Sequence, residues 1–125
     1  MNVNLRHNDL QIALHNLSGL YGEANVGTEN VCPSGKIDVV HRTGTQQHTF
    51  YEIKTASSAR GCICEGLAQI LEYSYWPDSQ EASELVIVGE APLEEAARQY
   101  IKKLRADFGL PLVYQRFDMA KGELV

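Results

Sequence analysis

Three side chains that could support metal-assisted chemistry occur within one short stretch of the sequence: Asp38, Glu52 and Lys54. Residues two apart in a β-strand project from the same face, so Glu52 and Lys54 would lie together if residues 48–54 form a strand. An antiparallel hairpin centred on Thr45 would set Asp38 opposite Glu52 and Lys36 opposite Lys54. The sequence therefore predicts that two carboxylates and a lysine converge on one face of a hairpin.

Two carboxylates at cross-strand distance repel each other unless a cation lies between them. Mg²⁺ suits this role because it binds oxygen ligands and keeps several waters, and the backbone carbonyl of Ile53 is a further candidate ligand. Such an ion polarises a phosphoryl oxygen and acidifies a bound water, while the ammonium of Lys54 helps to orient that water. The opposing interpretation is that Asp38, Glu52 and Lys54 are ordinary charges on a solvated sheet face, where ion pairs are common and weak.

Hydrophobic periodicity and turn residues predict the elements around this hairpin. Residues 21–35 are rich in glycine, asparagine and threonine and are expected to form a loop or a short irregular strand. Residues 85–89 are a continuous apolar run, which is typical of a central strand covered on both faces. The other expected elements are a helix over 8–17, hairpin strands over 36–42 and 48–54 with a turn at 43–47, a helix from about 60 to 76 capped by Ser57 or Ser58, a helix over 92–107 and a strand over 112–114. This order predicts an α/β fold in which helices flank a central mixed sheet.

The length and composition predict one ordinary globular domain over residues 1–125, which is either complete or part of a longer protein. No apolar stretch approaches the roughly 20 residues that span a bilayer, and the N-terminus lacks the apolar core of a signal peptide. We therefore expect a cytoplasmic protein with no membrane partner. The net charge of −5 gives no overall attraction for a polyanion, so nucleic-acid binding would need a local basic rim, for which Lys36, Arg42, Lys54 and Arg60 are available.

The cysteines and histidines show no ordinary metal-ligand spacing. Cys32, Cys62 and Cys64 are an odd set without a CxxC pair, so we expect reduced thiols; a site formed by these three cysteines and His41 is the less favoured alternative. The histidines are expected to be structural or exposed: His7, His15, His41 and His48.

Three short motifs follow one another along the chain: Gly35-Lys36-Ile37-Asp38, Glu52-Ile53-Lys54-Thr55 and Gln69-Ile70-Leu71-Glu72-Tyr73. Their order, and their expected placement on two strands and the following helix, resemble the PD-(D/E)xK nuclease superfamily and its RecB-type branch in particular. The resemblance covers roughly residues 23–76. It implies a restriction-endonuclease-like fold with an αβββαβ core, which agrees with the predicted order of elements.

The resemblance implies that Asp38 and Glu52 are metal ligands and that Lys54 positions the attacking water. Gln69 and Tyr73 lie one helical turn apart, so both would point toward the site from one face of the helix. There they would orient the substrate or the catalytic lysine. The alternative for both is a plain position on the helix surface or at the edge of the core.

Two further residues have less certain roles in this interpretation. Many members of the superfamily carry an acidic residue on or just after the first helix that completes the metal shell; Glu23 is the best-placed candidate, with Glu29 as the alternative. Arg60, at the start of the second helix, could clamp a phosphate through its guanidinium or could simply be solvated. Some relatives hold an iron–sulfur cluster with four cysteines, which this chain lacks, so no cluster is expected.

With the resemblance included, the sequence predicts a nuclease that depends on Mg²⁺, for which Mn²⁺ can substitute. It would hydrolyse phosphodiester bonds, and DNA is favoured over RNA as the substrate. Because the chain is short and acidic, a homodimer, an additional domain or a partner is expected to supply the grip on DNA. One alternative is a non-catalytic nucleic-acid-binding or protein-assembly module that keeps the nuclease fold. Another is a small α/β domain that binds a protein partner.

Overall fold

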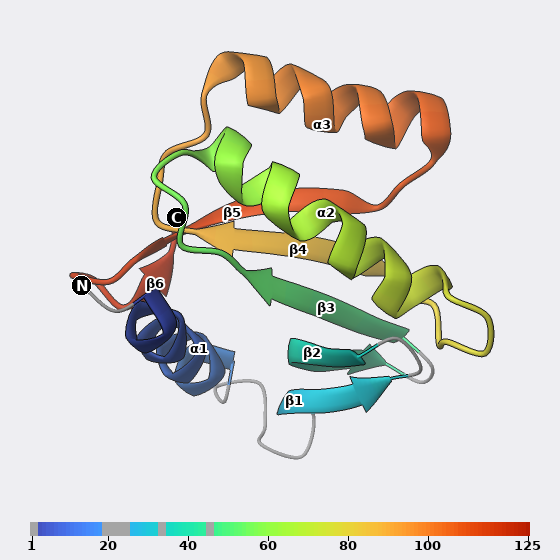
Figure 1. Cartoon of the computed structure of the whole chain (residues 1–125), viewed down its shortest axis with the longest axis horizontal. Helices are drawn as coiled ribbons and strands as arrows, with labels where there is room; N and C mark the ends of the chain where they lie inside the picture. Colours follow the sequence, from blue (N-terminus) through green and yellow to red (C-terminus); the bar gives the residue numbers. More distant parts are fainter. Residues whose placement is uncertain (1–2, 19–25, 33–34, 45–46) are drawn as a thin grey trace.

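A computed structural model describes residues 3–18, 26–32, 35–44 and 47–125 (Figure 1). Over these residues the protein has an α/β fold with a mixed sheet of six strands, which confirms the predicted fold class. The elements in chain order are α1 (Val3–Ser18), β1 (Val26–Cys32), β2 (Gly35–Gly44), β3 (Gln47–Ile53), α2 (Ala59–Tyr75), β4 (Glu84–Gly89), α3 (Glu95–Phe108), β5 (Leu112–Asp118) and β6 (Glu123–Leu124). The αβββαβ order expected for the core is therefore present from α1 to β4.

The sheet joins an antiparallel half to a parallel half at β3. The strands lie side by side in sequence order, with β1, β2 and β3 antiparallel and β3, β4 and β5 parallel, while β6 pairs antiparallel with β5. Parallel neighbours need a crossover connection, and α2 and α3 supply the two crossovers. Both helices lie on one face of the sheet, and α1 lies on the other (Figure 1).

Each face of the sheet has its own buried core. On one face α2 and α3 pack against the sheet, with buried residues that include Ile63, Ile70, Ile101, Leu85, Ile87 and Leu112. On the other face α1 is the covering helix, and the buried residues are Leu10, Leu14, Val39, Ile53, Val86, Val88 and Phe117. Val86 and Val88 face α1 and Leu85 and Ile87 face α2, so β4 is covered on both sides, as its continuous apolar run predicted.

The hairpin has the register that the sequence predicted. Val39 pairs with Tyr51 and Val40 with Phe50, which is the pairing about Thr45 that was expected, and a bulge lies between Arg42 and Gly44. The strands extend to residues 44 and 47, so the connection is shorter than the expected turn over 43–47. Asp38 and Glu52 are the next residues outward in this register.

The structure corrects the starts of two helices and decides between the loop and the strand that were both expected in residues 21–35. Helix α1 begins at Val3 rather than near residue 8, because its first turn makes tertiary contacts that local sequence does not show. Residues 26–32 form strand β1, since they pair with β2 along its length. Helix α3 begins at Glu95, and Pro92 lies before the helix rather than in its first turn. The two-residue strand β6 was not expected.

Helix α2 forms as its sequence predicted and places residues that the site uses. Ser58 is the N-cap, and its side chain accepts a hydrogen bond from the N–H of Gly61 at 3.0 Å. The helix ends at Tyr75, just before Pro77. Within the described parts of the chain, no helix is long and apolar enough to cross a membrane.

Replacing the capping serine should lower the stability of the protein, because one of the first N–H groups of α2 then loses its hydrogen bond. The effect should extend to the whole fold, since α2 covers the central strands. We expect Ser58→Ala to lower the free energy of unfolding by about 1 kcal/mol. The matched control is Ser57→Ala, an exposed serine one position earlier. Urea denaturation followed by circular dichroism measures both, and equal midpoints for the two variants would contradict the capping role.

Candidate functional site

Beyond the last backbone pair of β2 and β3, a side chain links the two strands. The Asp38 carboxylate accepts a hydrogen bond from the N–H of Ile53 at 2.9 Å through Oδ2. The N–H of Lys54 donates to the carbonyl of Val88 on β4, so the preceding N–H of Ile53 faces β2, because alternate residues of a strand face opposite neighbours. Asp38 therefore occupies the point where β2 and β3 separate.

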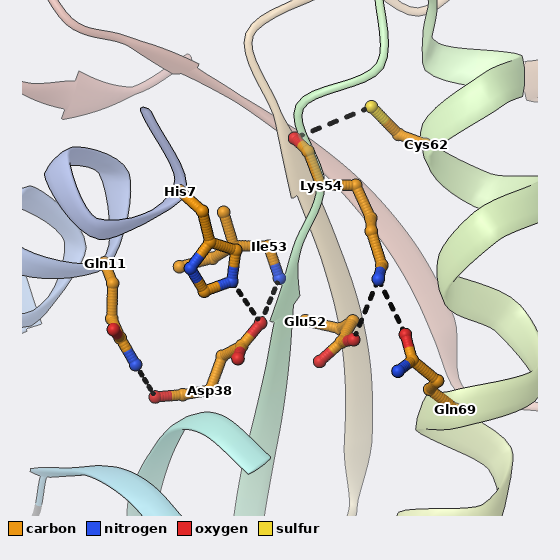
Figure 2. A network of polar contacts seen from close by, with 8 residues as sticks. All are labelled: His7, Gln11, Asp38, Glu52, Ile53, Lys54, Cys62 and Gln69. Carbon is orange, nitrogen blue, oxygen red and sulfur yellow. Dashed lines mark hydrogen bonds and ion pairs between the residues drawn. The ribbon is translucent and has the colours of Figure 1, made fainter. Parts of the chain in front are cut away.

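Helix α1 contacts the same aspartate twice. His7 Nε2 lies 3.1 Å from Asp38 Oδ2, and one turn later Gln11 donates from Nε2 to the Asp38 carbonyl at 2.9 Å (Figure 2). Burial alone would raise the pKa of the Asp38 carboxyl, but hydrogen bonds from His7 and from the Ile53 N–H lower that pKa below its usual value. Asp38 is thus held as a carboxylate in a fixed orientation.

Glu52 is the more deeply buried member of the carboxyl pair. It is 3% exposed, and among the described residues its Oε1 has no hydrogen-bond partner. Burial is the largest cause that raises the pKa of Glu52, and the negative charge of Asp38 and a hydrogen bond with its carboxylate act in the same direction. Lys54 acts in the opposite direction, and together these effects raise the pKa of Glu52 to about 8. The two neighbouring carboxyls therefore differ: Asp38 keeps its charge, and Glu52 holds a proton at neutral pH when no cation is present.

Lys54 is held beside Glu52 by helix α2. Its ammonium donates to Gln69 Oε1 at 2.6 Å and lies 3.4 Å from Glu52 Oε2 (Figure 2). A lysine ammonium can only donate, so the oxygen of the Gln69 amide must face it, and the amide nitrogen is left directed elsewhere. Gln69 therefore orients the lysine, which is one of the two roles expected for it.

The structure brings together four of the predicted site residues and leaves Tyr73 at the edge. Asp38, Glu52, Lys54 and Gln69 converge from β2, the end of β3 and the middle of α2 (Figure 2). Tyr73 is buried in the core on the α2 face, and a ring carbon would lie 3.4 Å from a Cβ added at Gly35. Tyr73 is therefore a core residue, and its contact with substrate stays a prediction.

The other candidates lie away from this cluster or cannot be placed. Arg60 lies nine residues before Gln69, about half a turn out of phase and roughly 13 Å along the helix axis. It lines a separate cavity of about 300 Å³ between α2 and α3, with Tyr100 and Glu94 among its other walls. Glu23 lies outside the described residues, and Glu29 lies on β1 without a described side chain.

The expected pairing of Lys36 with Lys54 does not occur. The paired residues of β2 and β3 end at Val39 and Tyr51, and Lys36 instead pairs with Val31 on β1. This follows from the separation of β2 and β3 at Asp38.

Two residues of the cluster were missed by sequence reasoning. His7 was expected only to be structural or exposed, and Gln11 was not considered, yet both contact Asp38. Their spacing of four residues puts them on one face of α1, which was a usable signal. It had little weight because nothing local indicates that this face of the helix meets β2.

The arrangement has a donor set that fits a hard divalent cation. Asp38 and Glu52 supply carboxylate oxygens, one of them buried and without a partner, and the carbonyl of Ile53 faces the same side of β3 as its N–H. In the described portion of the chain, no group of three or more histidine, cysteine, aspartate or glutamate side chains is arranged to hold a metal. Two carboxylates and a carbonyl would leave the other positions to water and substrate, as Mg²⁺ sites in proteins commonly do.

Cys32, Cys62 and Cys64 form no disulfide in the described part of the chain. Cys62 is buried, and its Sγ lies 3.8 Å from the Lys54 carbonyl and 3.6 Å from the Ala56 carbonyl. Burial raises the pKa of this thiol, which disfavours the thiolate that a metal would need. Cys62 therefore packs beneath the end of β3.

No protein-family model matches this chain, and comparison with curated proteins and with solved structures found no match. The chemistry of the cluster is therefore argued from its own geometry.

The raised pKa of Glu52 predicts a pH-dependent stability in the absence of metal. Between about 4.5 and about 8 the folded state binds more protons than the unfolded state, so the free energy of unfolding falls as the pH rises through this window. In the parent protein this fall in the free energy of unfolding should be on the order of a few kcal/mol at most, and Glu52→Gln should abolish it. Urea titrations in EDTA from pH 5 to pH 9 measure the difference.

The exposed Glu72→Gln variant on α2 is the control for this measurement and should follow the parent protein. Parallel stability curves for the parent and Glu52→Gln would show that Glu52 is ionised across the whole window, contrary to the burial and the Asp38 charge around it.

Proposed function

We propose that this protein is a metal-dependent nuclease that hydrolyses phosphodiester bonds, with DNA as its substrate and Mg²⁺ as its cofactor. One observation carries the proposal. A buried glutamate with an unpartnered oxygen lies beside a fixed aspartate, and a lysine held by Gln69 points at the same place. A cation between Glu52 and Asp38 would take the place of the Glu52 proton, balance the charge of the two ionised carboxylates and give the unpartnered oxygen a ligand.

The residues of the chain have distinct tasks in this reaction. Asp38, Glu52 and the carbonyl of Ile53 would hold Mg²⁺, which supplies Lewis-acid polarisation of the phosphoryl oxygen and acidifies water. Lys54 presents a positive charge where negative charge develops on the phosphate, and it can donate to the attacking water. Gln69 keeps the lysine extended over the site, because its amide oxygen accepts from the ammonium. Loss of the Glu52 proton accompanies binding of the cation.

The fold and the motifs support the same proposal. The αβββαβ order and the mixed sheet agree with the restriction-endonuclease-like arrangement that the PD-(D/E)xK resemblance implies. The RecB-type motifs supply Asp38, Glu52, Lys54 and Gln69, and these four are the residues that converge.

Substrate binding is expected to need help from outside this domain. The net charge is −5, so non-specific attraction for a polyanion is weak. We propose that a second copy of the chain, a further domain or a partner supplies the basic surface that holds the DNA. A cytoplasmic location is part of this proposal.

One observation favours a second candidate, a module that binds nucleic acid or assembles with protein without cleavage. No group of three or more metal-binding side chains was found in the described ranges, which leave out Glu23. The two proposals differ in turnover, and the same set of variants separates them.

Cleavage of DNA should depend on the divalent cation and on the cluster. With supercoiled plasmid and with single- and double-stranded oligonucleotides in Mg²⁺ or Mn²⁺, we expect Asp38→Ala and Lys54→Ala to lower kcat by about 100-fold or more. Gln69→Ala should lower kcat by about 10-fold, because the lysine remains but loses its orientation. The control is Lys103→Ala, on an exposed ion pair of α3. Cleavage that persists in EDTA, or at the parent rate in these variants, would contradict the mechanism.

Cation binding can be measured without any nucleic acid. Calorimetric titration with Mn²⁺ should show one site whose affinity falls by at least about 10-fold in Glu52→Gln. At pH 6.5, Mn²⁺ binding should release a proton, because Glu52 holds one before the cation arrives. Repeating the titration in buffers of different ionisation enthalpy measures this release. Equal affinity in the parent and in Glu52→Gln would remove this residue from the site.

A further inference from the structure

The start of helix α1 is tied to the end of the central strand β4. Arg6 donates to Glu90 through Nε at 2.8 Å, and its Nη2 bonds the second carboxylate oxygen. This two-bond pair joins residues 84 positions apart in sequence, and each side chain is about one third exposed. It lies next in sequence to His7, which contacts Asp38.

The tether has a physical reason at this end of the helix. The first turn of α1 contains no acidic residue, and a cation in the first turn is disfavoured by the helix dipole. The Glu90 carboxylate supplies the missing negative charge, and the pair raises the pKa of Arg6 above its usual value through hydrogen bonding and charge. Among the described side chains of α1, the buried leucines Leu10 and Leu14 lie one and two turns beyond Arg6.

Glu90 is itself a rigid attachment point. It follows Gly89 at the end of β4, and its carbonyl accepts a hydrogen bond from Arg116 Nε on β5 at 3.0 Å. A two-bond guanidinium–carboxylate pair sets an angle as well as a distance. The position of the first turn of α1 is therefore defined relative to β4, the strand beside the carboxyl pair.

We propose that the Arg6–Glu90 pair is a positioning device for the catalytic site, acting through His7 on Asp38. The pair fixes the rotation and the axial position of the first turn, and His7, the next residue, then reaches the Asp38 carboxylate from α1. Asp38 in turn keeps the orientation in which it meets Ile53 and faces Glu52. This proposal rests on the function proposed above, and its test includes a measurement that needs neither cleavage nor metal.

The test compares Arg6→Ala, Arg6→Lys and the charge exchange Arg6→Glu with Glu90→Arg. We expect Arg6→Ala to lower kcat and Mn²⁺ affinity by about 10-fold with KM for DNA unchanged. Its thermal midpoint should move by less than about 5 °C, because exposed ion pairs contribute little to stability. Arg6→Lys should recover part of the loss, and the charge exchange most of it. The control Arg98→Ala, from an exposed pair on α3, should match the parent.

The independent measurement is the nitrogen and proton spectrum of the His7 ring in metal-free protein, assigned by the signals lost in His7→Ala. Arg6→Ala should shift these ring signals toward those of a free histidine, and the charge exchange should restore them. Unchanged His7 signals, or unchanged kcat and Mn²⁺ affinity in Arg6→Ala, would overturn the positioning role. Absence of cleavage and Mn²⁺ binding in every protein, the parent included, would overturn the nuclease function, and the His7 signals would still decide the tether.

Discussion

The candidate site depends on one hydrogen bond, from the N–H of Ile53 to the carboxylate of Asp38. It is formed where β2 and β3 stop pairing, so a side chain supports the end of the hairpin. The same carboxylate contacts the ring of His7, and the backbone carbonyl of Asp38 accepts a hydrogen bond from Gln11. These two contacts join α1 to the sheet. One aspartate therefore connects two strands and a helix at the point where the carboxyl pair is formed.

The carboxyl pair illustrates how environment separates two chemically similar groups. Asp38 receives hydrogen bonds that favour its charged form, while Glu52 is buried and faces the charge of Asp38. The pKa of one is lowered and that of the other raised to about 8. This difference leaves a protonated glutamate next to a carboxylate and a lysine, an arrangement that a divalent cation would convert into two ionised ligands.

Much of the fold followed from local patterns in the sequence. The alternation in residues 36–42 and 48–54 predicted the hairpin, and centring its turn on Thr45 predicted the register that the structure shows. Ser58 and the apolar spacing predicted α2, and the unbroken apolar run predicted β4. The start of α1 and strand β6 were not predicted, and strand β1 was left open between a loop and a short strand, because each is stabilised by contacts with distant residues rather than by its own sequence.

The candidate site divides in the same way. By itself, the sequence determined that Asp38, Glu52 and Lys54 share one face of the hairpin and that Gln69 lies on one face of the following helix. These relations follow from the strand period of two residues and the helix period of three to four. Only the tertiary structure decided that Arg60 lines a cavity between α2 and α3 and that Tyr73 packs into the core. It also decided that His7 and Gln11 reach Asp38, because the docking of α1 depends on packing and on an ion pair between residues 84 positions apart.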